Sequence, residues 1–570
     1  MKVVIIGGVA GGATAAARIR RLDEQAEIVV FERSGFISYA NCGLPYYIGG
    51  TIEDENDLTL QTPESFWKRF RVKMKVHHEV TAICPDSKTV IVKNLENSTV
   101  FTESYDKLVL SPGAKPIRPN FEGVGSDKIF TLRTVEDTLK IKKYVDERRP
   151  QSAVVVGGGF IGIEVAENLR ELGIGVTLVE AAEQLMAPFD SDMASFIHAE
   201  VRKNGINLML GRMVEGFADT DCGIDLKLKD GTTLHADMVV MSIGVAPETA
   251  LAKNAGLELG IKGSIVVNDK METSIPDIYA VGDAVQIKNF VTDTYTLISL
   301  AGPANKQGRI AADNICGGDS HYTGGQGSSV IKIFDMTAAA TGINEKIAKA
   351  LGLFTDKVIL SPMSHAGYYP GGKMMTMKVI FEKETYRILG AQIVGFDGVD
   401  KRIDVLATAI RSGIKAYELV ELDLAYAPPY SSAKDPVNMA GFIIENIKNG
   451  VVKQWYYEDY ETLRRHGSVT LLDTRTPMEY NMGHAEGFIN IPVDDLRERI
   501  DELDRSKPVY VICQSGLRSY IASRILVGNG FDAYNFAGGF RFYDAVRNDK
   551  ALNGKSTPCG MDTFCRQRKD

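Results

Sequence analysis

The stretch Val3-Val4-Ile5-Ile6-Gly7-Gly8-Val9-Ala10-Gly11-Gly12 decides the fold of the first part of the chain. A short β-branched run ends at a glycine-rich turn, and the alanine-rich residues 13–22 predict a helix directly after it. A second strand is predicted over residues 27–31, and Glu32 follows it. Such glycines let the backbone approach a pyrophosphate, the helix N-terminus stabilises its charge, and the acid binds ribose hydroxyls. The pattern therefore predicts a dinucleotide-binding unit, with Val9 replacing the middle glycine of the usual fingerprint.

The same unit occurs a second time. Ala153-Val154-Val155-Val156 leads into Gly157-Gly158-Gly159-Phe160-Ile161-Gly162, followed by a predicted helix over residues 163–172 and a predicted strand over 176–179. Glu180 ends this strand, where a carboxylate favours free ribose hydroxyls and repels a 2′-phosphate. NADH is therefore favoured, and NADPH stays an alternative. The NAD-binding residues predicted here are Gly157, Gly159, Phe160, Ile161, Gly162 and Glu180.

Size and composition set limits on the class of protein. A length of 570 residues predicts three or four domains, and 44% hydrophobic with 24% charged residues is typical of a globular protein. A net charge of −8 argues against nucleic acid as the main partner. The seven cysteines are scattered and show no metal-ligand spacing, so neither a disulfide scaffold nor a metal site is expected. No segment is long and apolar enough to span a membrane, and we expect a cytoplasmic protein without a membrane partner.

Two further segments carry a family resemblance. Tyr105-Asp106-Lys107-Leu108-Val109-Leu110-Ser111-Pro112-Gly113-Ala114 and Thr273-Ser274-Ile275-Pro276-Asp277-Ile278-Tyr279-Ala280-Val281-Gly282-Asp283 both resemble segments of the flavoprotein disulfide reductases with two dinucleotide-binding domains. The resemblance covers about residues 1–445 and assigns FAD to the first unit and NADH to the second. The FAD-binding residues that it implies are Gly7, Gly8, Ala10, Gly11, Gly12, Glu32, Gly113 and Asp283.

A lone thiol follows the first unit. Cys42 stands in Ser38-Tyr39-Ala40-Asn41-Cys42-Gly43-Leu44-Pro45-Tyr46-Tyr47, and Tyr47 occupies the place where a dithiol flavoenzyme has its second cysteine. Single-cysteine members of the superfamily are either NADH oxidases and peroxidases or coenzyme A-disulfide reductases. The peroxide-cleaving branch has a histidine in the first glycine turn, and here that residue is Ala10.

Several motifs resemble the coenzyme A-disulfide reductases. Ser38, Asn41 and Cys42 match their S-x-x-N-C-x-L-P-Y motif, and the segments 364–371 and 426–435 match motifs of their interface domain. The resemblance implies a homodimer in which tyrosines reach the partner's active site, with Tyr426 close to the thiol. It also implies basic residues for the coenzyme A phosphates, and leaves Arg69 and Arg71 as alternatives for one of them. The coenzyme A-binding residues implied are Arg21, Ser38, Asn41, Arg69, Arg71, Tyr368 and Tyr426.

The C-terminal part has a second thiol. A predicted strand over residues 509–512 runs into Cys513-Gln514-Ser515-Gly516-Leu517-Arg518-Ser519 and a helix over 520–526. Converging N–H groups, a helix N-terminus and Arg518 favour a thiolate and a bound anion. With Asp473-Thr474-Arg475 and the Gly-His motif beginning at residue 483, residues 455–548 resemble a rhodanese domain, which carries sulfane sulfur as a persulfide. The rhodanese residues implied are Asp473, Cys513, Gln514, Ser515, Gly516, Leu517 and Arg518.

These resemblances imply an α/β chain. It has two Rossmann-like dinucleotide-binding domains, an α+β dimerisation domain and a C-terminal α/β rhodanese domain. The expected boundaries are 1–149 with 271–325 for FAD, 150–270 for NAD, 326–450 for dimerisation, 455–548 for rhodanese and 549–570 for a polar tail. Cys559 and Cys565 lie in that tail, where a resolving or metal-binding role is the less favoured alternative.

The whole chain resembles the coenzyme A-disulfide reductase–rhodanese fusions. The resemblance implies an FAD- and NADH-dependent enzyme that reduces coenzyme A disulfide, coenzyme A persulfide or polysulfide through a Cys42–coenzyme A mixed disulfide, with Cys42, Tyr426 and Cys513 as catalytic residues. The flavin and a local helix N-terminus are expected to stabilise the Cys42 thiolate. The alternatives are an NADH oxidase, a dithiol-type reductase and a redox sensor without turnover. The preferred sulfur substrate and the direction of sulfur flow between the two thiols stay open.

Overall fold

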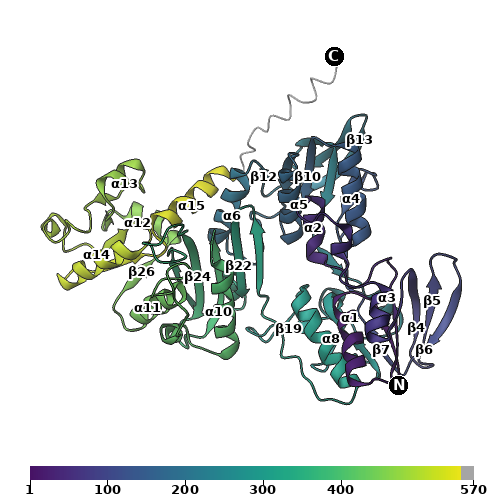
Figure 1. The fold of residues 1–570 in the computed structure, drawn as a ribbon. Helices are drawn as coiled ribbons and strands as arrows, with labels where there is room; N and C mark the ends of the chain where they lie inside the picture. Colours follow the sequence, from purple (N-terminus) through teal and green to yellow (C-terminus); the bar gives the residue numbers. More distant parts are fainter. Residues whose placement is uncertain (554–570) are drawn as a thin grey trace. The chain divides into compact units, whose positions relative to one another are not determined.

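The computed structural model describes residues 1–553 and separates them into two compact units (Figure 1). The first unit contains Met1–Glu183 and Gly205–Gly327, and the second contains Gln184–Asn204 and the described residues from Ser328 onward. Cys559 and Cys565 lie outside the described residues. Within residues 1–553, every helix is too short or too polar to cross a membrane.

The first sheet of the first unit is built around the N-terminal strand, as predicted. All its neighbouring strands are parallel, and helix α1 (Ala10–Leu22) begins inside the glycine turn and packs against α8 (Ala301–Ile315) (Figure 1). Gly7 has φ of +98°, and a Cβ on Gly12 would lie 1.9 Å from the Gly7 carbonyl oxygen, so this turn requires glycine. The strands in spatial order are β18 (Ile278–Ala280), β7 (Lys107–Leu110), β1 (Lys2–Ile6), β2 (Glu27–Phe31) and β3 (Lys73–Lys75).

The second sheet of this unit repeats the plan. It is parallel, and helix α5 (Phe160–Glu171) follows its central strand at the second glycine turn. Helix α4 (Val135–Arg148) connects the edge strand to the centre. The strands in spatial order are β12 (Asn207–Met209), β11 (Gly175–Val179), β10 (Ser152–Val156), β16 (Met238–Met241) and β9 (Ile129–Thr131).

Antiparallel strands complete the first unit. Each dinucleotide-binding fold has a three-stranded sheet inserted in its sequence, the first between β3 and β7 and the second between β12 and β16, and a two-stranded pair connects residues 114–116 to 245–247. The strands of the three-stranded sheets are β4 (His78–Cys84), β5 (Thr89–Asn94) and β6 (Val100–Ser104), then β13 (Val214–Thr220), β14 (Gly223–Leu228) and β15 (Thr233–Ala236).

The second unit contains one antiparallel and one parallel sheet. The antiparallel sheet carries α10 (Val399–Ser412) against β22 and β25, and α11 (Pro436–Lys448) contacts β23. Its strands in spatial order are β21 (Ser329–Ile333), β22 (Met336–Gly342), β25 (Ile388–Gly395), β24 (Met375–Glu382) and β23 (Thr355–Leu360). The mixture of antiparallel strands and helices is the α+β arrangement expected for the dimerisation domain.

The parallel sheet corresponds to the predicted rhodanese segment. Its strands in spatial order are β26 (Lys453–Trp455), β30 (Ala533–Phe536), β29 (Val509–Ile512), β27 (Thr470–Asp473) and β28 (Ile489–Asn490). The accompanying helices are α12 (Tyr460–His466), α13 (Pro477–Met482), α14 (Leu517–Gly528) and α15 (Gly539–Leu552) (Figure 1). Helix α15 continues past residue 548, so part of the expected polar tail is helical.

A segment from the middle of the chain also belongs to the second unit. Helix α6 (Ser191–Lys203) lies in sequence between β11 and β12, yet it packs against α15. His198 Nδ1 lies 2.8 Å from Asp549 Oδ2, and Arg202 donates to Asp549 Oδ1 at 2.6 Å. The Leu185 N–H donates to His198 Nε2 at 3.0 Å, which places the imidazole proton on Nδ1. Burial alone would raise the pKa of Asp549, but the contacts with His198 and Arg202 hold it below its usual value.

The Asp549 contacts give a stability prediction. Asp549→Asn removes the carboxylate that pairs with Arg202, and we expect a loss of about 2 kcal/mol, seen as a fall of roughly 4–8 °C in the melting of the second unit. Because the folded pKa of Asp549 is lowered, its contribution is present near neutral pH and is lost as the pH falls through the folded pKa. Circular dichroism melting at several pH values checks this.

The matched control is Asp544→Asn on the same helix. Asp544 pairs with Arg547 near the surface, so its loss should change the melting temperature little. Equal shifts for the two variants would contradict a special role for the Asp549 contacts.

Candidate functional site

The first thiol lies on a loop that is fastened to the first glycine turn. Cys42 is exposed and stands in a 3-10 turn, η1 (Asn41–Gly43), which leads into the short helix α2 (Leu44–Ile48). The Ser38 N–H donates to the Gly8 carbonyl at 2.9 Å, and α2 contacts α4 and α5. The loop therefore connects the dinucleotide turn of the first fold with the first helix of the second.

The surroundings of Cys42 within the chain do not favour a thiolate. Burial of the sulfur raises the pKa of Cys42, the Glu164 carboxylate raises it further, and Arg133 opposes them. Burial and the neighbouring Glu167 raise the pKa of Glu164 itself to about 7. A helix N-terminus was expected to stabilise the Cys42 thiolate. The helix at this place, α2, is only Leu44–Ile48, and desolvation and Glu164, which disfavour the thiolate, outweigh the opposing effect of Arg133.

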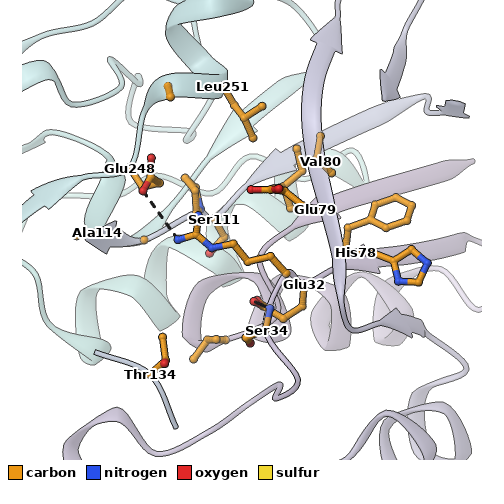
Figure 2. Close-up of a pocket in the computed structure, with 18 of the residues that line it drawn as sticks. Glu32, Ser34, His78, Glu79, Val80, Ser111, Ala114, Thr134, Glu248 and Leu251 are labelled. Carbon is orange, nitrogen blue, oxygen red and sulfur yellow. Dashed lines mark hydrogen bonds and ion pairs between the residues drawn. The ribbon is translucent and has the colours of Figure 1, made fainter. Parts of the chain in front are cut away.

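Residues predicted for FAD gather around one cavity. A cavity of about 380 Å³ is lined by Gly7, Glu32 and Gly113, together with residues of β4 and the 248–254 segment (Figure 2). Glu32 accepts hydrogen bonds from the Gly8 and Ser34 N–H groups, both at 2.9 Å. Backbone glycines on one side and an acid at a strand end are what a pyrophosphate and a ribose require, so the residues fit the cofactor. Gly11 and Gly12 lie in the first turn of α1, and Ala10 begins it.

Arg133 is a residue of this cavity that the sequence reasoning missed. Its guanidinium donates to Asp283 Oδ2 at 3.0 Å and to the Ala114 carbonyl at 3.1 Å, and so joins Asp283 to the turn at Gly113. Arg33 also lines the cavity, 3.9 Å from Glu248 (Figure 2). Arg33 directly follows Glu32, so its place beside the strand end could have been inferred. Nothing in the local sequence around Arg133 indicated its role.

In the second glycine turn, as in the first, the glutamate at the strand end accepts a hydrogen bond from a glycine N–H. Glu180 accepts from the Gly158 N–H at 2.6 Å and from the Ala182 N–H at 2.7 Å. A Cβ on Gly162 would lie 1.8 Å from the Gly157 carbonyl oxygen, whereas a Cβ on Gly159 would meet nothing within 4 Å. Packing therefore explains glycine at residue 162, and the open space at residue 159 fits close approach by a ligand. Phe160 and Ile161 begin α5 directly after this turn.

The predicted coenzyme A residues fall into two groups. In the first unit, Arg20 is buried and donates to the Phe70 and Arg71 carbonyls at 2.8 and 3.2 Å, which joins the ends of α1 and α3 (Pro63–Phe70). Arg21, Arg69 and Arg71 are exposed around this junction. The buried Asn41 side-chain oxygen has no partner among the described residues, which fits a ligand donor.

In the second unit, the two predicted tyrosines meet. The Tyr368 and Tyr426 hydroxyls are 2.6 Å apart, and both side chains are exposed. Their hydrogen bond raises the pKa of Tyr426. The buried Arg402 donates to the Ser364 carbonyl at 2.9 Å and pairs with Asp435 at 3.0 Å, so one guanidinium holds both tyrosine loops. Arg402 lies outside the motifs, and no local pattern indicated its role.

The second thiol is buried in its own loop. Cys513 follows β29, and its Sγ accepts hydrogen bonds from the Gly516 N–H and the Ser519 hydroxyl, both at 3.1 Å. Leu517 is exposed at the start of α14, while Gln514 and Ser515 complete the turn. Asp473 is paired with Arg475 and is fully buried. These are the residues of the predicted rhodanese loop, gathered in one place.

Arg518 is paired with an acid that the sequence did not indicate. Both of its terminal nitrogens donate to Glu479, each at 2.7 Å. Glu479 was not predicted as a site residue. Its place three residues after Thr476 predicts a capping box, and the structure contains one. The same spacing does not predict the pairing with Arg518.

The setting of Cys42 yields a prediction for the holoenzyme. Glu164→Gln removes a carboxylate that disfavours the thiolate, so the pKa of Cys42 should fall. Site-resolved alkylation by iodoacetamide, read by mass spectrometry across pH, should be severalfold faster in the variant above about pH 7 and equal below it, where Glu164 is protonated. Glu171→Gln on the same helix is the control, and a rate equal to that of wild type at every pH would contradict the role of Glu164.

Comparisons with known proteins agree with this layout. The profile of the pyridine nucleotide-disulphide oxidoreductases matches residues 1–308, that of their dimerisation domain matches 328–436, and that of the rhodanese-like domain matches 456–545. Coenzyme A disulfide reductase of Staphylococcus aureus is 38% identical over 443 residues, which cover 77% of this chain and 99% of that protein.

Solved structures show the same similarity. Reduced Bacillus anthracis CoADR-RHD is 48% identical with a TM-score of 0.94, covering 96% of this chain and 98% of that one. A NAD-dependent persulfide reductase from A. fulgidus is 37% identical with a TM-score of 0.90, covering 95% and 100%. A water-forming NADH oxidase from Lactobacillus brevis is less similar, at 31% identity and a TM-score of 0.76 over 79% of this chain and 100% of that one.

Proposed function

The chain belongs to the pyridine nucleotide-disulphide oxidoreductase family, and from this premise we propose that it is an FAD-dependent NADH oxidoreductase acting on coenzyme A disulfide, coenzyme A persulfide or polysulfide. The observation that carries the proposal is the lone exposed thiol of Cys42 on a loop fastened to the first dinucleotide turn. Tyr47 in place of a second cysteine leaves an incoming sulfur compound as the disulfide partner of Cys42.

The proposed mechanism is thiol–disulfide exchange at Cys42. The Cys42 thiolate attacks coenzyme A disulfide or coenzyme A persulfide at the sulfur bound to coenzyme A. The substrate's S–S bond breaks, a Cys42–coenzyme A disulfide forms, and coenzyme A thiol or sulfide leaves. When bound, FAD supplies two electrons from NADH, which return Cys42 and coenzyme A to thiols. Asn41 and the exposed arginines around α1 and α3 bind the coenzyme A part. Arg402 positions the Tyr368–Tyr426 pair, and Tyr426 protonates or stabilises the leaving thiolate.

Cys513 handles the sulfane sulfur in this proposal. The two hydrogen bonds to its Sγ suit a sulfur that attacks and then carries a second sulfur as a persulfide. The proposal leaves the direction of transfer between Cys513 and Cys42 to experiment. It links sulfur transfer to reductive release of sulfide in one chain.

The family and the composition also support proposals for the oligomeric state, the partners and the cellular compartment. The match to a dimerisation domain indicates a homodimer, and we propose that Tyr426 serves the partner's thiol, as in an isologous two-fold dimer. Small-molecule disulfides and persulfides are the proposed partners, and the net charge of −8 supports the absence of a nucleic acid partner. We propose a cytoplasmic setting, because few, scattered cysteines are typical of reducing compartments.

Anaerobic turnover separates the proposed roles of the two thiols. We expect wild type to oxidise NADH with coenzyme A disulfide and with polysulfide, and Cys42→Ser to lose both activities by at least about a thousandfold. Cys513→Ser should keep coenzyme A disulfide reduction and lose sulfide release from persulfide donors. NADH consumption only when oxygen is admitted would identify an oxidase and overturn the proposal.

Cofactor choice tests the role of Glu180. Glu180→Ala combined with Ala181→Arg removes the carboxylate facing the ribose and adds a cation for a 2′-phosphate. The ratio of kcat/KM for NADPH to that for NADH should rise at least about tenfold, which corresponds to about 1.4 kcal/mol. Ala181→Arg alone keeps the bracing of Gly158 and serves as the control. An unchanged ratio in the double variant would argue against Glu180 as the determinant.

A further inference from the structure

The arginine whose charge acts on Cys513 is already paired within the protein. Arg518 lies within electrostatic range of the Cys513 sulfur, yet both terminal guanidinium nitrogens bind Glu479 at 2.7 Å. The hydrogen bond from Arg518, together with those from Thr476, outweighs partial burial and lowers the pKa of Glu479 to about 2. Glu479 is therefore ionised throughout the physiological pH range, and the pair is neutral overall.

The second cation of the loop region is also used internally. Arg475 is buried, pairs with Asp473 at 2.7 Å and donates to the Gly483 carbonyl at 2.8 Å. Its guanidinium carbon lies 3.8 Å from the centre of the Phe540 ring. These contacts hold the buried Arg475 guanidinium within the fold.

Arg541, near the start of α15, contributes its backbone N–H to the Cys513 loop. The Arg541 N–H donates to the Gln514 carbonyl at 3.2 Å, while its guanidinium carbon lies 5.6 Å from the Phe196 ring of α6. The neighbouring Phe540 N–H donates to the Cys513 carbonyl at 2.7 Å. The start of α15 thus fixes the loop. The Arg541 guanidinium faces Phe196, and its buried Nε has no hydrogen-bond partner among the described residues.

Exposed apolar side chains occur on the elements that carry the paired charges. Met478 and Met482 on α13, which also bears Glu479, are 74% and 80% exposed, and Leu517 at the end of the thiol loop is 65% exposed. Methionine and leucine offer an adaptable apolar surface to an organic chain. Such a surface offers nothing to a small inorganic dianion.

We propose that Glu479 is a specificity-determining residue, which neutralises Arg518 and thereby selects organic persulfides over thiosulfate as sulfur donors to Cys513. The proposal rests on the sulfur-handling role proposed for Cys513 and names its substrate class. A persulfide R–S–SH reacts as the Cys513 thiolate attacks the outer sulfur, the S–S bond breaks, R–SH leaves with the proton, and Cys513–S–S⁻ forms. The same attack on thiosulfate releases sulfite and brings a dianion against a thiolate, while Arg518 is already neutralised by Glu479 and cannot offset the repulsion.

Glu479→Gln in the full-length holoenzyme frees Arg518 while keeping an oxygen for the α13 cap. Rates of persulfide formation on Cys513, read by mass spectrometry of its peptide, are compared with thiosulfate and with coenzyme A persulfide as donors. We expect wild type to favour coenzyme A persulfide, and Glu479→Gln to raise kcat/KM for thiosulfate at least about tenfold without raising it for the persulfide.

Two further variants keep the test sharp. Glu479→Gln combined with Arg518→Gln should return thiosulfate use to the wild-type level, because the gain requires the freed guanidinium. Glu461→Gln removes an exposed carboxylate elsewhere in the same domain and should change neither donor. Circular dichroism melting checks that α13 remains folded in each variant.

The possible failures are distinguishable. Equal use of both donors by wild type, or no gain for thiosulfate in a folded Glu479→Gln variant, overturns the role of Glu479 while Cys513 still handles sulfur. Absence of persulfide on Cys513 with every donor and variant overturns the proposed sulfur step, and the selectivity with it. NADH turnover at Cys42 is measured separately and depends on neither result.

Discussion

In both dinucleotide-binding units, a helix begins so close to the preceding strand that the two backbones leave no room for a side chain. A Cβ on Gly12 or Gly162 would lie within 2 Å of a carbonyl oxygen in the turn before it. This close approach directs the helix N-terminus and its free N–H groups at the end of the sheet. The carboxylates of Glu32 and Glu180 then brace the turns by accepting from Gly8 and Gly158. The Cys42 loop depends on the same geometry, because Ser38 is hydrogen-bonded to Gly8.

The two thiols lie in opposite environments, which fits different tasks. Desolvation by the surrounding protein and the Glu164 carboxylate raise the pKa of Cys42, and Arg133 only partly opposes them, so the chain on balance disfavours the thiolate. A bound flavin is the group that the family places there, and coupling the thiolate to the cofactor would limit reactivity to the loaded enzyme. Cys513 instead has two donors within its own loop, with a neutral ion pair beside it. Its reactivity is therefore a property of the loop.

The glycine turns, their strands and the parallel sheets could be predicted from sequence, because local backbone rules dictate them. The strand over residues 27–31 has the predicted limits, and the predicted helix at residue 13 begins only slightly earlier, at Ala10. Pairings across long sequence separations could not be predicted. Arg133 pairs with Asp283, and Glu479 pairs with Arg518. Arg402 binds the loops that carry Tyr368 and Tyr426. No local sequence pattern encodes these contacts. The pairing with Glu479 gives Arg518 a carboxylate partner that was not predicted.

The rhodanese fold is an integral part of the second unit, as the charges at its junction with the antiparallel sheet demonstrate. Lys357 on β23 is buried, and pairs with Glu458 at 2.6 Å and with Glu345 at 2.9 Å. The Tyr456 hydroxyl donates to Asp356 at 2.6 Å across the same junction. Buried charges are tolerated only when paired, so a chain ending before residue 455 would leave Asp356 without the Tyr456 hydroxyl and Lys357 without Glu458. The junction therefore fixes the Cys513 domain to the sheet from which the Tyr368 and Tyr426 loops extend, within the second unit.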